Sequence, residues 1–134
     1  MKLHGAILID VSAGTDSSFE RSLLDRLGHP VLLCHGPAES GDCPILIGAG
    51  CELVESAHGI IFELDLDLAQ HRTILQRYRK IVAADVPIGA VVRPGQETRY
   101  ADVLEGIVVW TSKPTTDELG TFAATSEAYD RAVE

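Results

Sequence analysis

Two carboxylates and one ammonium group stand where aliphatic runs of this sequence end. The runs cover residues 6–11, 31–34, 59–64, 88–92 and 107–111, and the residues at or just after their ends are Asp10, Cys34, Glu63, Val92 and Lys113. If the runs are parallel strands, these residues gather at one edge of a sheet, where a lysine would lower the proton affinity of a neighbouring acid. The other interpretation is a partly exposed ion pair without a chemical role, which contributes under about 1 kcal/mol.

A second group of reactive side chains lies in the Gly- and Pro-rich stretch after residue 34. Cys34, His35, Cys43 and Cys51 could bind zinc, or an iron–sulfur cluster with His35 as the fourth ligand. The stretch lacks a Cys-x-x-Cys pair, and free cysteines often pack as small apolar residues. A metal site, a reversible disulfide and plain packing all remain open.

The elements that must position these residues follow from the same pattern. Helical stretches separate the five aliphatic runs, and Ser17 with Glu20 and Thr115 with Glu118 have the spacing of capping boxes. Strands that are aliphatic throughout predict a parallel sheet buried on both faces. We therefore expect an α/β fold in one domain, residues 1–134.

Composition excludes several classes of protein. The chain has 134 residues, a net charge of −9 and 46% hydrophobic residues, which indicates a packed core and disfavours nucleic acid as a partner. It contains no run long enough for a membrane span and no signal peptide, so we expect a cytoplasmic protein with reduced thiols. The histidines outside the cysteine stretch have no partner spacing and are expected at the surface or in loops, not as ligands; they are His4, His29, His58 and His71.

Two segments carry a resemblance to a known family. Residues 109–114 read Val-Trp-Thr-Ser-Lys-Pro before a capped helix, and residues 58–64 read His-Gly-Ile-Ile-Phe-Glu-Leu. With the intervals from Glu63 to Val92 and from Val92 to Lys113, these segments make the whole chain resemble a response-regulator receiver domain of the CheY type. The resemblance implies a three-layer, doubly wound sheet of five parallel strands in the order 2-1-3-4-5.

The chain departs from that family where phosphoryl chemistry occurs. The family's phosphoacceptor aspartate corresponds to Glu63, which is one methylene longer and spoils both in-line attack and Mg²⁺ geometry. Asp10 matches one member of the family's acidic pair but stands between aliphatic neighbours, and Val92 replaces a hydroxyl residue. Lys113, Pro114 and the switch-position aromatic Trp110 are retained. We expect an atypical, phosphorylation-independent receiver in which Glu63 pairs with Lys113 and holds a fixed state.

The resemblance also implies how such a module would act. We expect a stand-alone signalling protein without enzymatic activity or cofactor, which binds a protein partner and forms a homodimer. The expected surface is the fourth helix, fifth strand and fifth helix, near Tyr100, Trp110 and Tyr129. The alternative function is a thiol or metal redox sensor that uses residues 34–51. A nucleotide-binding enzyme is disfavoured because no phosphate-binding glycine loop follows the first strand.

Overall fold

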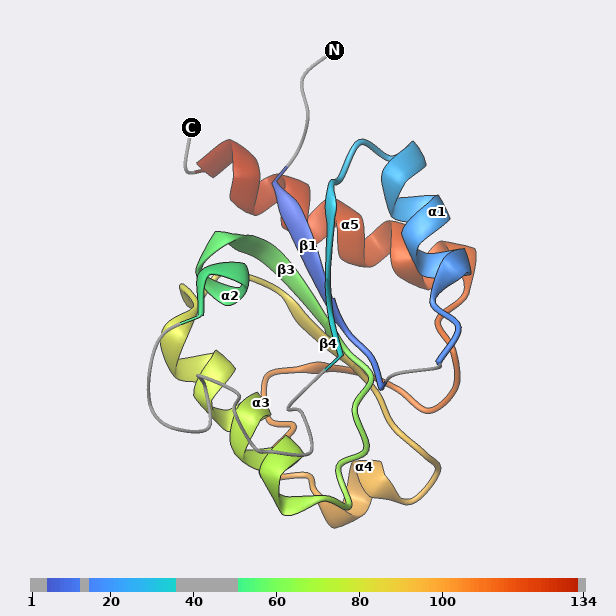
Figure 1. Cartoon of the computed structure of the whole chain (residues 1–134), viewed down its shortest axis with the longest axis vertical. Coiled ribbons are helices and arrows are strands. Elements are labelled where there is room, and N and C mark those ends of the chain that lie inside the picture. Colours follow the sequence, from blue (N-terminus) through green and yellow to red (C-terminus); the bar gives the residue numbers. More distant parts are fainter. Residues whose placement is uncertain (1–4, 13–14, 36–50, 133–134) are drawn as a thin grey trace.

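The five aliphatic runs form one parallel sheet. The computed structural model describes residues 5–12, 15–35 and 51–132 of the chain (Figure 1). The strand order β2-β1-β3-β4-β5 confirms the expected topology. The strands are β1 (Ala6–Asp10), β2 (Val31–Cys34), β3 (Ala57–Phe62), β4 (Ile88–Val91) and β5 (Val108–Trp110).

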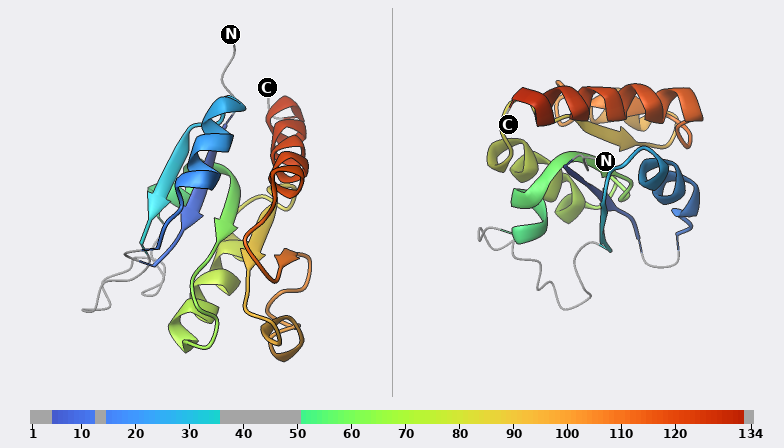
Figure 2. Two further views of the ribbon diagram at one scale, coloured as in Figure 1. Left: turned by 90° about the vertical axis from the view of Figure 1, so that its right-hand side faces the viewer. Right: turned by 90° about the horizontal axis from the view of Figure 1, so that it is seen from above.

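Helices cover both faces of the sheet and complete a three-layer, doubly wound fold. The helices are α1 (Ser18–Arg26), α2 (Glu52–Ser56), α3 (Ala69–Ile81), α4 (Gln96–Arg99) and α5 (Thr116–Ala132). The helices α1 and α5 lie side by side on one face (Figure 2). The helices α2 and α3, with the segment that follows α4, pack on the other face. None of the helices in the described ranges is long and apolar enough to cross a membrane.

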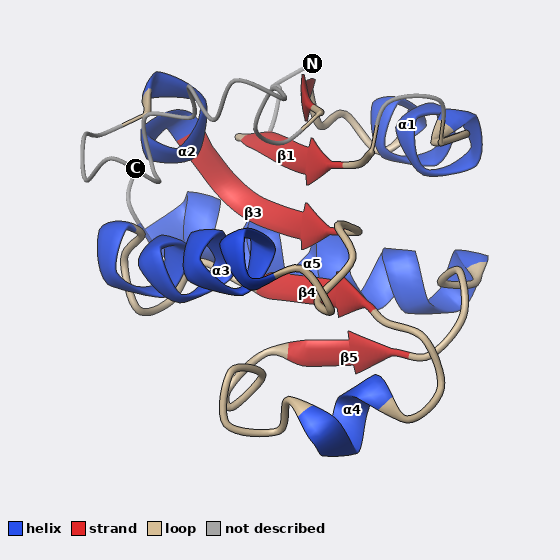
Figure 3. Ribbon diagram, turned by 60° about the horizontal axis from the view of Figure 1, so that its bottom comes forward, coloured by secondary structure: helices blue, strands red, loops and turns tan. Residues whose placement is uncertain are grey.

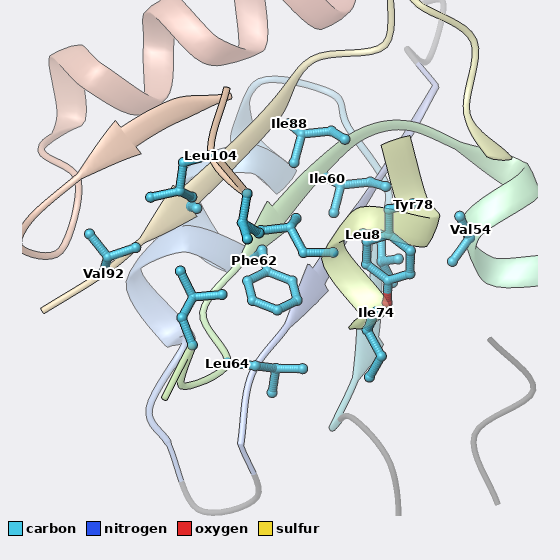
Figure 4. Close-up of a cluster of buried hydrophobic side chains, with 14 of the residues drawn as sticks. Leu8, Val54, Ile60, Phe62, Leu64, Ile74, Tyr78, Ile88, Val92 and Leu104 are labelled. Carbon is cyan, nitrogen blue, oxygen red and sulfur yellow. The ribbon is translucent and has the colours of Figure 1, made fainter. Parts of the chain in front are cut away.

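Alternation along the strands divides the core in two. Successive strand side chains point to opposite faces, so Ile7 and Ile9 join the cluster beneath α1 and α5, whereas Leu8 joins the cluster beneath α3. Figure 3 shows β1, β3, β4 and β5 running in the same direction. In the α3-side cluster, the Phe62 and Tyr78 rings meet edge to face at 6.3 Å between centroids (Figure 4). The face of the sheet on which a residue lies therefore decides its neighbours.

The two expected capping boxes have different outcomes. At α5 the box is confirmed, because the Thr115 N–H donates to Glu118 Oε1 at 2.9 Å and the Glu118 N–H donates to Thr115 Oγ1 at 3.2 Å. At α1 it is wrong: within the described residues Ser17 makes no side-chain capping bond, and the Ser18 N–H donates instead to Asp16 Oδ1 at 2.9 Å. Glu20 is thereby freed from the expected cap, and α1 buries it together with leucines.

The far end of α5 is fixed to the amino-terminal ends of β1 and β3. Asp130 accepts hydrogen bonds from the Gly5 N–H at 2.9 Å and from the imidazole of His58. The Ser126 hydroxyl donates to the His58 carbonyl at 2.9 Å. His29 lies in the loop before β2, as expected, although it is buried, and a ring nitrogen contacts the Gly5 carbonyl. His71 is buried on α3, so the expectation of a surface or loop position is wrong for it; a ring nitrogen contacts the Asp65 carbonyl.

Candidate functional site

The turn after β5 carries Lys113 to the carboxyl edge of the sheet. Trp110 ends β5 and is buried, with its ring 5.8 Å from that of Phe122 on α5. The Val92 N–H donates to the Trp110 carbonyl at 2.8 Å and holds this end of β5 against the residue that follows β4. Pro114 is buried between Lys113 and the first turn of α5. The lysine thus projects from a turn that is fixed on both sides.

Lys113 donates to three acceptors from three different segments. Its Nζ lies 2.7 Å from Glu63 Oε1, 2.9 Å from Glu20 Oε2 and 3.1 Å from the Asp16 carbonyl. The expected pairing of Glu63 with Lys113 is therefore confirmed. An ammonium group has three hydrogens, and all three have an acceptor here. We call Glu20, Glu63 and Lys113 the carboxylate–lysine cluster.

The two carboxylates of the cluster are buried, although the lysine is half exposed. The Glu20 and Glu63 side chains are 2% and 4% exposed, against 47% for Lys113. Burial and the adjacent Glu20 carboxyl raise the pKa of Glu63 to about 7, and the opposing effect of Lys113 is smaller. The bonds to the two carboxylates outweigh the burial of Lys113, which alone would lower its pKa, and raise that pKa above its usual value. Glu63 therefore holds a proton more tightly than a surface glutamate does.

Asp10 does not join this cluster, which corrects the expectation of Asp10, Glu63 and Lys113 converging. Asp10 is in register with Phe62, and both side chains lie on the α3 face, whereas Glu63, the next residue after Phe62, lies on the opposite face. The Tyr78 hydroxyl donates to Asp10 Oδ2. Burial raises the pKa of Asp10, opposed in part by Tyr78, Cys34 and His71. The second carboxylate beside Lys113 is that of Glu20 and not that of Asp10. The sequence pattern had assigned Glu20 to the cap of the first helix.

Val92 also lies on the α3 side of the sheet, in the cluster that contains Phe62. Because Phe62 is in register with Ala90, the β4 residue beside Glu63 is Val91, which packs on the α1–α5 side. The residue that follows the β4 register to Glu63 is therefore Val91, one residue earlier in the sequence than the predicted Val92. Both residues are valines and neither can donate a hydrogen bond.

The cysteine stretch is described only at its ends. Cys34 and Cys51 pack, partly buried, against the α3-side core. His35 is exposed, and Cys43 lies outside the described residues. Among the residues that the structure describes, no group of three His, Cys, Asp or Glu side chains could hold a metal ion. The metal and disulfide interpretations stay predictions.

A polar network next to the cluster was not predicted. Asp67, after β3, accepts bonds from Arg93, from Arg99 at 3.1 Å and from the Tyr100 hydroxyl at 2.6 Å. Asp65 accepts from Arg93 at 2.9 Å and from the Gln96 amide at 3.1 Å. The bonds to Asp67, above all the one from the Tyr100 hydroxyl, lower the pKa of Asp67. The alternating acids of residues 63–67 were a signal, but their basic partners lie about 30 residues on, beyond any local pattern.

The residues at this edge do not fit a resident Mg²⁺ ion. Magnesium requires nearly octahedral oxygen ligands. Here Asp10 faces the other side of the sheet, Val11 and Val91 are aliphatic, and the Lys113 ammonium lies against Glu63 Oε1, where it would repel a cation. The arrangement is an ion cluster of two buried carboxylates and one half-exposed ammonium group.

Solved structures of response-regulator receivers share the fold over nearly the whole chain. A response regulator receiver domain protein from Clostridium thermocellum matches with a TM-score of 0.67 and 17% identity, over 97% of this chain and 99% of that one. The Mn²⁺-bound response regulator Rcp1 matches with a TM-score of 0.58 and 16% identity, over 97% of each chain. The phosphorylated cyanobacterial phytochrome response regulator RcpA matches at 0.56 and 14%, over 98% and 96%.

These likenesses concern the fold. No protein-family model matches the chain, and no curated protein matches it in sequence. The structure has the doubly wound fold of response-regulator receiver domains, as the Lys-Pro segment and the strand pattern predicted.

Proposed function

We propose that this chain is a receiver-like signalling module that acts by binding protein, without enzymatic activity and without phosphorylation. The observation that carries the proposal is the occupation of the acceptor edge by the buried Glu63–Lys113 pair. In receiver domains that accept a phosphoryl group, the reactive carboxylate lies at this edge of the sheet. Here that carboxylate is hydrogen-bonded at one oxygen and buried at the other.

Phosphoryl transfer would require several changes at once. Glu63 would have to leave Lys113 and reach solvent, and a metal ion would have to bind beside the Lys113 ammonium group. Each step separates buried opposite charges, which is strongly unfavourable. We infer that the module stays in a fixed, unphosphorylated state.

The proposal is tested with a small phosphodonor and Mg²⁺, followed by intact-mass measurement. We expect the mass to remain unchanged. A typical receiver domain, treated in parallel, controls for an active donor. A labile adduct of one phosphoryl group would overturn the proposal, and its loss in Glu63→Gln would place it on Glu63.

We further propose that a second copy of the chain binds at the α4–β5–α5 face. β5 is an edge strand, and its Val108 side chain is 48% exposed. Beside it lies a hollow of about 290 Å³, between β5, α5 and the residue that precedes β4. Its lining is apolar at Pro87, Val108, Trp110 and Phe122 and polar at Asp117, Glu118, Thr121 and Thr125. Exposed apolar groups next to an open strand edge favour association. Trp110 and Tyr100 are less suitable probes than the sequence suggested, because one is buried and the other holds Asp67.

Val108→Asp is therefore the informative variant. We expect sedimentation velocity over a concentration series to show a dimer that this substitution dissociates. Leu68→Asp is the matched control, because Leu68 is equally exposed, at 48%, but precedes α3. A monomer at every concentration, or a dimer that Val108→Asp leaves intact, would contradict the proposed face.

A further inference from the structure

The carboxylate–lysine cluster has one more acid than base in a buried place. Glu20 and Glu63 come from α1 and from the end of β3, and they are adjacent because Glu20 Oε2 and Glu63 Oε1 lie 2.9 and 2.7 Å from the same Lys113 Nζ. Lys113 is the only ammonium that the described residues bring to them. With both acids ionised, the cluster carries one uncompensated negative charge, which burial disfavours.

The hydrogen bonds of the cluster leave a place for one more proton. Lys113 has used its three hydrogens on Glu63 Oε1, Glu20 Oε2 and the Asp16 carbonyl. Glu63 Oε2 is buried and has no hydrogen-bond partner among the described residues. A hydrogen on one of the carboxyl groups could be donated to the other, and the cluster would then be neutral.

We propose that Glu20 and Glu63 together bind one proton from solvent, so that the edge where receivers carry metal and phosphate holds a proton-binding site in this chain. The proton attaches to a carboxyl oxygen, and no other bond breaks. The inference concerns the isolated protein and does not depend on partner binding. It adds a response to pH to a module that lacks a phosphorylation site.

The charges around the cluster are consistent with this assignment. On its open side lie Asp65 and Arg93, which bond to each other, and the Asp16 carboxylate bonds Ser18. Asp10 lies on the other face of the sheet. Neither neighbouring segment therefore supplies a second free cation to compensate the extra charge. The pKa of Glu63, raised to about 7 by burial first and by Glu20 second, agrees with proton uptake near neutral pH.

The sign of the pH effect follows from linkage. The folded protein holds the proton up to about pH 7, whereas unfolded Glu63 releases it near its usual pKa of 4.5. The stabilisation is therefore complete below about pH 4.5 and is lost as the pH rises through about 7. Glu63→Gln imitates the protonated form, so this variant should lack that part of the pH dependence.

The direct test is a pH titration of the glutamate side-chain carboxyl carbons by ¹³C NMR in the uniformly labelled protein. We expect one shared transition near neutral pH that is visible at both Glu20 and Glu63. Glu63→Gln and Glu20→Gln should each abolish it, and exposed Glu105→Gln is the matched control that should leave it unchanged.

Two results would overturn the inference. One is that both glutamates in the wild-type protein titrate only below about pH 5, which requires no variant to fold. The other is a neutral transition that survives in both glutamine variants. Because neither measurement involves a partner or a phosphodonor, failure here would leave the proposed function standing, and a protein that proves monomeric could still show the transition.

Discussion

Replacing Lys113 by methionine should destabilise the fold in a strongly pH-dependent way. The substitution keeps the length of the side chain but leaves two carboxylates, 2% and 4% exposed, without a cation. Removing one partner of a buried ion pair typically costs about 3–5 kcal/mol. Lys113 is 47% exposed, so water can partly replace it, and we expect a loss of about 2 kcal/mol at pH 8.

The loss should shrink in acid. As the pH falls through 7, Glu63 takes up a proton and the need for a cation decreases, so we expect about 1 kcal/mol or less at pH 5. Urea unfolding followed by the fluorescence of Trp110, the only tryptophan, measures both values. With a slope of about 2 kcal/mol per M, the midpoint should move by about 1 M at pH 8. Exposed Lys80→Met is the control and should leave the midpoint unchanged at both pH values. An equal loss at pH 8 and pH 5 would refute the reasoning.

Two further predictions concern the core. Tyr78→Phe removes the hydroxyl that donates to buried Asp10, so unfolding free energy should fall by about 1–3 kcal/mol, measured by urea unfolding; an unchanged midpoint would show that the bond contributes nothing. Gly89→Ala places a Cβ about 2.6 Å from the Trp110 ring and should cost about 1–3 kcal/mol with an altered fluorescence spectrum. Gly120→Ala on α5 meets no atom within 4 Å and should instead stabilise by up to about 1 kcal/mol, so thermal unfolding should order the two variants oppositely.

The sheet could be predicted from the sequence because each strand is a short aliphatic run followed by a helix, which fits few folds other than a parallel sheet. The pairing of Glu63 with Lys113 could be predicted because both follow strand ends, and strand ends share an edge. The face of the sheet on which the Asp10 side chain lies could not be predicted. Residues 6–11 are aliphatic on both sides of Asp10, so the alternation that separates it from Glu63 depends on the register of β1 with β3, which is a tertiary property.

Glu20 was missed for a different reason. Its spacing from Ser17 matches a local capping box, and a local explanation hides a long-range role. The one hint was its place on α1: Glu20, Leu23 and Leu24 share a helical face, and a charged residue on an apolar face needs a partner from elsewhere. Lys113, 93 residues away, is that partner.

The Asp67 network has a mechanical consequence. The Asp67 carboxylate joins the loop before α3 to Arg93, which precedes α4, to Arg99 in α4 and to Tyr100, which follows it. These contacts couple α4 to that loop. The arginine contacts are exposed and weaken as dissolved ions accumulate, whereas the phenol bond of Tyr100 is much less affected. Ionic strength therefore sets how freely α4 can be displaced, with Tyr100 as the tether that remains in concentrated salt.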